Sequence, residues 1–113
     1  MKVSSKKAKG RGLQKNMKNI LLECFKGQLE EDDIRSTSMG ASGVDLLLSP
    51  AAQKLIPFAI ECKNQERLNI WSAIEQAEKN ATQTLKPLVV FKKNYSKTYV
   101  ALELNEFLAL LKK

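Results

Sequence analysis

The chain has 113 residues, a formal net charge of +7 and no histidine. This length supports one domain with a single hydrophobic core, and no apolar stretch approaches the length needed to cross a bilayer. The lack of histidine and of a Cys-x-x-Cys pair disfavours a structural zinc site. The two cysteines, Cys24 and Cys62, fit a reducing cytoplasm better than a disulfide scaffold.

The positive charge is concentrated at the N-terminus. Residues 1–18 contain seven basic residues and no acidic one, and the 12 other basic residues are balanced by 12 acidic ones. We therefore predict a basic flexible arm over residues 1–10, followed by a single domain over residues 11–113. Such a patch attracts nucleic-acid phosphates through counterion release. The alternative is a solubilising tail.

Apolar periodicity predicts an amphipathic helix over residues 12–26, with Leu13, Met17, Ile20, Leu21 and Cys24 on its apolar face. Two strands are expected next, over residues 34–39 and 44–49, on either side of a Gly/Ser turn at residues 40–43. Ser49-Pro50 suits the cap and first position of a brief helical turn. A third strand over residues 54–63 is expected to be the central one.

Asn69 can cap a second helix, which carries Ile70, Ile74, Ala77 and Ala81 on one face. Strands follow at residues 87–92 and 97–104, with a turn around residues 94–96, and a last helix begins near Asn105. The expected order is α-β-β-β-α-β-β-α, which is an α/β fold.

The third strand carries charges where an apolar strand is expected. Side chains alternate along a strand, so Glu61 and Lys63 share one face and Ile60 and Cys62 share the other. Asp45 lies 16 positions before Glu61, and the two carboxylates converge if their strands are antiparallel neighbours.

Two converging carboxylates repel each other unless a cation lies between them, and hard oxygen ligands suit Mg²⁺ or Mn²⁺. Lys63 would then stand beside the metal, where it could orient a water or neutralise charge on a phosphate. The alternative is that Glu61 and Lys63 form an ordinary surface pair and Asp45 is a turn residue.

The motif Asp45…Glu61-Cys62-Lys63 resembles the signature of the PD-(D/E)XK nucleases, and the predicted order of elements resembles their common core. The basic first helix and the segment "RSTSMGASGVD" are similar to archaeal-type Holliday junction resolvases and small phage-encoded relatives. The resemblance implies a restriction-endonuclease-like core with a central mixed β-sheet of about five strands.

The resemblance also implies roles for individual residues. Asp45 and Glu61 match the metal-binding carboxylates of the family. The backbone carbonyl of Cys62 matches the third metal ligand, and Lys63 matches the catalytic lysine. Gln76 resembles a glutamine near the site in some subfamilies, and Ser38 or Ser42 could take the place of a serine that resolvases carry before the aspartate.

The sequence departs from the family pattern at one position. Family members often carry a glutamate on the first helix, and Gln14 lies where it would be found. A neutral amide could hold a metal-bound water but disfavours a second metal ion.

The function implied by the resemblance is a Mg²⁺- or Mn²⁺-dependent endonuclease that cuts four-way or branched DNA by metal-activated water attack. It would act as a homodimer making paired nicks, in the cytoplasm of a bacterial or archaeal cell.

The dimer surface is expected on the helix of Trp71, the strand of Val89 and Phe91, or the C-terminal helix with Phe107, and Trp71 could equally belong to the core. The alternatives are another nuclease of this fold and a non-catalytic DNA-binding protein. The residues expected to contact DNA are Lys6, Lys7, Lys9, Arg11, Lys15, Arg35, Ser36 and Ser38.

Overall fold

A computed structural model describes residues 3–37 and 43–113, with side chains described from residue 8 onward. The predicted site residues Ser38 and Ser42, and the side chains of Lys6 and Lys7, lie outside this description. Within the described ranges, no helix has the length and apolar character that a membrane span requires.

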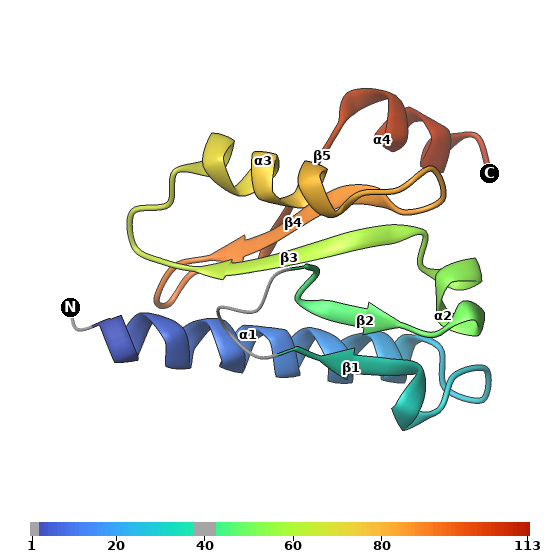
Figure 1. Cartoon of the computed structure of the whole chain (residues 1–113), viewed down its shortest axis with the longest axis horizontal. Coiled ribbons are helices and arrows are strands. Elements are labelled where there is room, and N and C mark those ends of the chain that lie inside the picture. The colour runs from blue at the N-terminus through green and yellow to red at the C-terminus, as the bar shows by residue number, and fades with distance from the viewer. Residues whose placement is uncertain (1–2, 38–42) are drawn as a thin grey trace.

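In Figure 1, α1 lies below strands β3 and β4 and α3 lies above them. The elements are α1 (Val3–Cys24), a 3₁₀ turn (Glu31–Asp33), β1 (Ile34–Ser36), β2 (Leu46–Leu48), α2 (Pro50–Leu55), β3 (Phe58–Asn64), α3 (Ile70–Asn80), β4 (Lys86–Lys92), β5 (Tyr99–Leu102) and α4 (Leu104–Leu111). The predicted order of helices and strands is present, and the brief helical turn after Ser49 is α2.

The strands do not form the single five-stranded sheet that the sequence predicted. In the described ranges β1 and β2 make an antiparallel pair, and β3, β4 and β5 make a second sheet in that order. This second sheet is mixed, because β3 runs parallel to β4 and β4 antiparallel to β5. β3 is therefore an edge strand of its sheet, not the central strand. Its free edge faces β2, where one backbone bond from Asp45 N–H to the Ile60 carbonyl (3.2 Å) links the two sheets.

α1 begins at Val3 and not at residue 12, so residues 3–10 are helical where a flexible arm was predicted. Lysine and alanine have high helix propensity, which explains how a segment without apolar periodicity can extend the helix. The packed face also differs from the prediction. Leu13 is buried and Met17 and Leu21 are partly buried against the core, but Ile20 and Cys24 are exposed.

The third strand begins later than predicted, because α2 takes up residues 54 and 55. Ser49 caps α2 by accepting a hydrogen bond from Ala52 N–H, and Pro50 occupies its first turn. Pro57 cannot continue the helix and disfavours helical geometry at Ile56, which is not helical (φ −127°, ψ 83°). The chain then enters β3 at Phe58.

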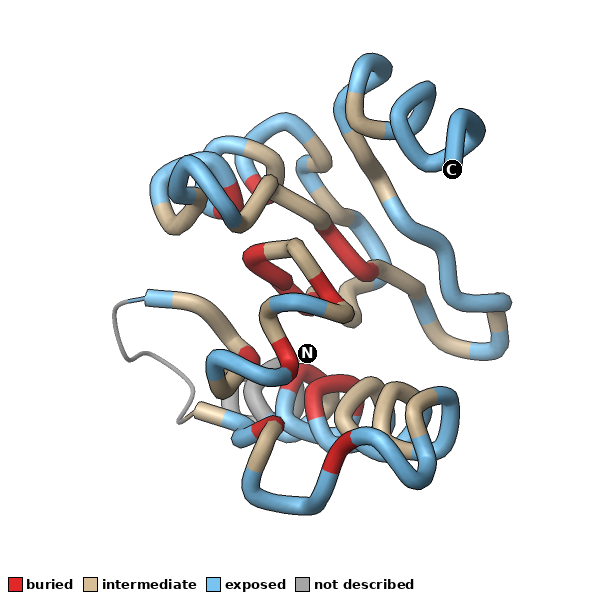
Figure 2. Tube along the Cα trace, turned by 90° about the vertical axis from the view of Figure 1, so that its right-hand side faces the viewer, coloured by how far each residue is buried: buried red, intermediate tan, exposed pale blue. Residues whose placement is uncertain are grey.

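The core has two parts, one on each face of the β3–β4–β5 sheet. Ile60, Cys62 and Val90 pack towards α1, with Leu13 in the same cluster. Val89 packs towards α3, against Ala73 and Ala77. The buried segments accordingly lie between the α1 layer and the α3 layer (Figure 2). Since side chains alternate along β3, Glu61 and Lys63 point to the α3 face.

Candidate active site

Asp45 is held at the free edge of β3 by three hydrogen bonds, two with β3 and one with Thr37. Its side-chain Oδ2 accepts a hydrogen bond from the backbone N–H of Cys62 at 2.6 Å. Its own N–H donates to the Ile60 carbonyl, and its carbonyl accepts from the N–H of Thr37 at 2.9 Å. The carboxylate is therefore fixed beside β3, even though β2 itself begins only at Leu46.

Glu61 and Lys63 lie together on one face of β3, as the alternation predicted. Glu61 is buried, with an exposed fraction of 7%. Its Oε1 lies 3.7 Å from Lys63 Nζ, and its carboxyl group is close enough to that of Asp45 for the two to share a hydrogen bond. The structure thus brings Asp45, Glu61 and Lys63 into one cluster.

The electrostatics of this cluster favour a bound cation. Burial, the Asp45 charge and a hydrogen bond to Asp45 raise the pKa of Glu61 to about 7, and the charge of Lys63 offsets only part of this. Burial also raises the pKa of Asp45, although the Cys62 N–H and Lys63 act in the opposite direction. Two carboxyl groups with raised pKa values and one lysine leave a site that a further positive charge would stabilise.

The backbone of Cys62 supplies a third oxygen on the same edge. In a strand, the N–H and C=O of one residue point to the same side. The Cys62 N–H points to Asp45, so the Cys62 carbonyl also points to this free edge. Its thiol points to the other face, into the α1 core. Burial raises the pKa of this thiol to about 12, so it is protonated at neutral pH and is no thiolate ligand.

These donors fit a hard divalent cation. Among the described residues, no group of three or more His, Cys, Asp or Glu side chains could hold a metal ion. The available set is two carboxylates and one backbone carbonyl, which are oxygen ligands of the type that Mg²⁺ and Mn²⁺ prefer, with waters completing the coordination shell. The close approach of the partly buried Asp45 carboxyl group to the buried Glu61 carboxyl group is the observation that such an ion explains.

α3 covers the site on the face to which Glu61 and Lys63 point. Asn80, the last residue of α3, donates from Nδ2 to the carbonyl of Gly43 at 3.0 Å, two residues before Asp45. Gln76 lies one turn before Asn80 and shares its side of the helix. Gln76 is therefore exposed on the side of α3 that faces the Asp45 segment.

Two residues that hold Asp45 were not identified from the sequence. Thr37 Oγ1 donates to the carbonyls of Val44 at 3.0 Å and Asp45 at 3.1 Å, and Asn80 binds Gly43 as described above. Both contacts join residues that are distant in the chain and reach only backbone atoms, so neither leaves a motif in the sequence.

Gln14 is fully buried on α1 and accepts a hydrogen bond from Ser36 Oγ at 2.8 Å. Ser36, predicted to contact DNA, therefore also serves to hold α1 against β1. Gln14 is the polar residue that α1 contributes to the interior, at the position where the sequence suggested that an acid was replaced. An amide there adds no negative charge to the Asp45–Glu61 cluster.

The basic residues predicted to contact DNA divide into exposed and buried groups. Arg11, Lys15 and Arg35 are exposed. In contrast, Lys9 Nζ is buried and has no hydrogen-bond partner among the described residues, and the same holds for Asn64 Oδ1 at the end of β3. The N-terminal half of α1 runs below the C-terminal end of β3 (Figure 1). An unpaired buried ammonium is costly, so Lys9 is a group that a bound anion would satisfy.

The comparisons with known proteins agree with this geometry. The profile of the family described as "Phage putative PDDEXK endonuclease" matches residues 5–113, almost the whole chain. No curated protein and no solved structure matches the chain. A family match of this extent, together with Asp45, Glu61 and Lys63 gathered at one strand edge, leads to one conclusion: the chain belongs to the PD-(D/E)XK superfamily, in a family of phage endonucleases.

Proposed function

We propose that this protein is a Mg²⁺- or Mn²⁺-dependent DNA endonuclease whose site is formed by Asp45, Glu61, the Cys62 carbonyl and Lys63. The observation that carries the proposal is the approach of the partly buried carboxyl group of Asp45 to the buried carboxyl group of Glu61, with Lys63 beside them. Such a pair is unstable when both groups are ionised and becomes a ligand set when a divalent cation binds.

Each residue has a role that follows from its place. Asp45, Glu61 and the Cys62 carbonyl hold the cation, which supplies a Lewis acid to the scissile phosphate when bound. Lys63, on the same face as Glu61, donates hydrogen bonds to a phosphate oxygen and neutralises negative charge that develops on it. Gln76, exposed on α3 above the edge, orients the substrate backbone or a water molecule.

We assign the contacts with the DNA backbone to exposed basic residues of the first elements. Arg11 and Lys15 are exposed on α1 and Arg35 on β1, and we assign all three to phosphate contacts. Lys9 would complete this set by turning its Nζ, which is buried in this structure, out towards a phosphate, where the ammonium gains a partner. These contacts position the DNA without reading its sequence.

The substrate we propose is branched DNA, with a four-way junction as the preferred form. The likeness of the basic first helix and of residues 35–45 to resolvases supports this choice. A four-way junction is resolved by two symmetry-related nicks, and one chain carries one Asp45–Glu61–Lys63 site. We therefore propose a homodimer, acting in the cytoplasm of a bacterial or archaeal cell.

The first experiment compares binding and cleavage on matched four-way, flap and linear DNA, with Mg²⁺ and with chelator. The resolvase proposal predicts tighter binding to the junction in chelator and paired nicks in Mg²⁺. Metal-dependent cutting without junction preference would support another nuclease of this fold and overturn the resolvase proposal. Binding without cutting in either Mg²⁺ or Mn²⁺ would overturn the nuclease proposal itself. A monomer at micromolar concentration, free and on junction DNA, would also contradict the resolvase proposal.

A further inference from the structure

α4 is an apolar helix that packs against little of the rest of the molecule. Not one of its eight residues, all of them described, is buried. Figure 2 shows it exposed along nearly its full length, at the edge of the molecule. The exposed apolar side chains of this helix are Leu104, Phe107, Leu108, Leu110 and Leu111. A helix this apolar is normally buried, so α4 lacks the surface that it would cover.

A groove beside α4 has apolar walls that no helix covers among the described residues. A cavity of about 320 Å³ lies between α3 and the β4–β5 pair. Its apolar walls are formed by Trp71, Ile74, Ala77, Pro87, Val89, Ala101 and Leu102. Trp71, the only tryptophan of the chain, is 73% exposed at this groove. Apolar patches of this kind mark interaction sites.

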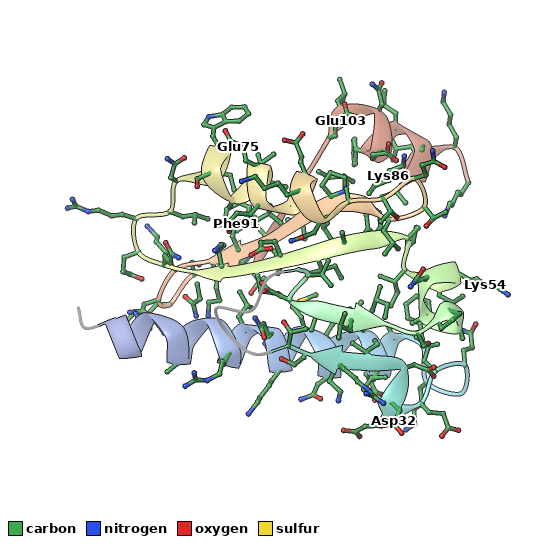
Figure 3. All side chains as sticks on the ribbon, viewed as in Figure 1. Asp32, Lys54, Glu75, Lys86, Phe91 and Glu103 are labelled. Atoms are coloured by element: carbon green, nitrogen blue, oxygen red, sulfur yellow. The ribbon has the colours of Figure 1, made fainter. Side chains whose placement is uncertain are left out.

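The groove lining and the C-terminal end of α4 carry opposite charges. Glu78 and Glu103 are the charged residues of the groove lining, and Figure 3 labels Glu103 at the start of α4. Lys112 and Lys113 follow directly after the last turn of α4. An apolar helix with a basic end therefore matches an apolar groove with acidic walls, and both occur on the same chain.

α4 does not fill the groove of its own chain. Leu102 and Glu103 line the cavity, but the lining includes no residue of α4. Glu103 also caps α4, because its Oε2 accepts a hydrogen bond from Asn105 N–H at 2.9 Å. The helix thus starts at the cavity wall, without a linker that would let it turn back over the same cavity.

We propose that α4 of one copy docks in the α3–β5 groove of a second copy, and that the second copy returns the same contact across a two-fold axis. Self-complementarity of this kind is what a two-fold dimer requires. The inference rests on the homodimer of the proposed function and names its surface. It requires neither metal nor DNA.

The proposed contact leaves the nuclease site open. Trp71, Ile74 and Glu78 lie at successive turns of α3 and line the groove. Gln76 and Asn80 occupy the other side of the helix, towards Gly43 and Asp45. The two copies can therefore associate through one side of α3 while DNA approaches the other.

Sedimentation and light scattering of the full chain, without DNA or metal, test this proposal. We expect a dimer of about twice the 12.7 kDa chain at micromolar concentration, with a dissociation constant raised about 100-fold or more by Leu108→Glu. Ala109→Glu is the matched control, because it adds the same charge on the side of α4 that faces away from the stripe of Leu104, Phe107, Leu108 and Leu111, and it should remain a dimer. A monomeric wild type, or a Leu108→Glu variant that dimerises as well as wild type, would overturn the proposal.

A mixing experiment distinguishes the reciprocal contact from a dimer in which α4 packs on α4. Trp71→Lys damages the groove, and its exposed position makes it compatible with folding, which circular dichroism checks. Leu108→Glu and Trp71→Lys should each be monomeric alone, but their mixture should form heterodimers, because one intact helix meets one intact groove. Failure of the mixture to associate at about 100 μM, where each folded variant is soluble, would contradict the reciprocal contact. Because assembly is measured without DNA, a loss of nuclease activity elsewhere does not affect the outcome.

Discussion

The free edge of β3 and the α3–β5 groove lie on opposite sides of α3. The edge has acidic groups that a cation would neutralise, and the groove has apolar side chains that an apolar surface would cover. At the edge, the partly buried carboxyl group of Asp45 is held beside the buried carboxyl group of Glu61 by the hydrogen bond from Cys62 N–H. At the groove, Trp71 and the leucines of α4 are apolar side chains left in solvent. The first arrangement is stabilised by a cation and the second by an apolar protein surface. The comparison shows that one small domain can carry its proposed metal site and its proposed dimer surface on separate sides of one helix.

Removal of a carboxylate at the β3 edge should abolish most of the DNA cleavage and leave dimerisation through the α3–β5 groove unchanged. We expect Glu61→Gln or Asp45→Asn to lower the rate of DNA cleavage by about 10³-fold or more, because each removes a ligand and its charge. Thermal stability in chelator should hold or rise, since the repulsion between the two carboxylates is gone. Glu75→Gln, an exposed change on α3 (Figure 3), is the control. A Glu61→Gln enzyme that cuts at the wild-type rate would remove Glu61 from the site.

The pH dependence of stability should also separate the two regions. Because the pKa of Glu61 rises from 4.5 to about 7 on folding, the folded state retains a proton that the unfolded state has released. In chelator, the free energy of unfolding should therefore fall as the pH rises from about 4.5 to 7, by up to about 1.4 kcal/mol per pH unit. Urea titrations across this range would measure it. Glu61→Gln should flatten the slope and Leu108→Glu should not; an equal slope in wild type and Glu61→Gln would contradict the raised pKa.

Thr37→Val tests whether the position of Asp45 matters as well as its charge. The change deletes the two hydrogen bonds from Oγ1 to the carbonyls of Val44 and Asp45. We expect a loss of about 1 kcal/mol in stability and about a tenfold loss in cleavage rate, with metal affinity reduced in parallel. Thr98→Val, at an exposed threonine, is the control. A stability loss without any change in rate would mean that Asp45 does not depend on Thr37 for its position.

The exposed bases of α1 should contribute to affinity and not to chemistry. The double variant Arg11→Gln/Lys15→Gln removes two proposed phosphate contacts, so the slope of log binding constant against log salt should decrease by about two units. The cleavage rate at saturating DNA should change little. Lys54→Gln/Lys97→Gln removes the same charge from exposed positions elsewhere and should leave the slope unchanged. An unaltered slope in the α1 variant would place the DNA on another face.

Local signals in the sequence predicted most of the elements. The cap at Asn69 accepts a hydrogen bond from Ser72 N–H, and Ser49 with Pro50 begins α2 as expected. The first turns of α1 were missed because Lys and Ala residues show no apolar period, although they favour helix. The sheet was over-predicted for a different reason. Pairing between β2 and β3 depends on how they approach in space, and here it amounts to one bond, from Asp45 to Ile60.

The candidate site was predictable where its geometry follows from the chain itself. Glu61 and Lys63 share a face because they are two residues apart on a strand, and the structure places them 3.7 Å apart. The approach of Asp45 was predicted on the condition that its strand pairs with the strand of Glu61. The two strands lie in separate sheets, and the hydrogen bond from Cys62 N–H still holds Asp45 beside β3. Thr37 and Asn80 could not be found, because they bind backbone carbonyls, and a contact with a backbone atom requires no particular residue type at that position. Burial of Lys9 Nζ likewise depends on the packing of α1.

Calorimetric titration of the full chain with Mn²⁺ at pH 7, in buffers of different ionisation enthalpy, tests the central claim most directly. We predict saturable binding with release of about half a proton, because a carboxyl group with a pKa of about 7 is half protonated before the ion displaces its proton. Glu61→Gln should lose both the binding and the proton release, and the groove variant Leu108→Glu should keep both. Absence of Mn²⁺ binding by the wild type, or equal binding by Glu61→Gln, would contradict a metal site at Asp45 and Glu61.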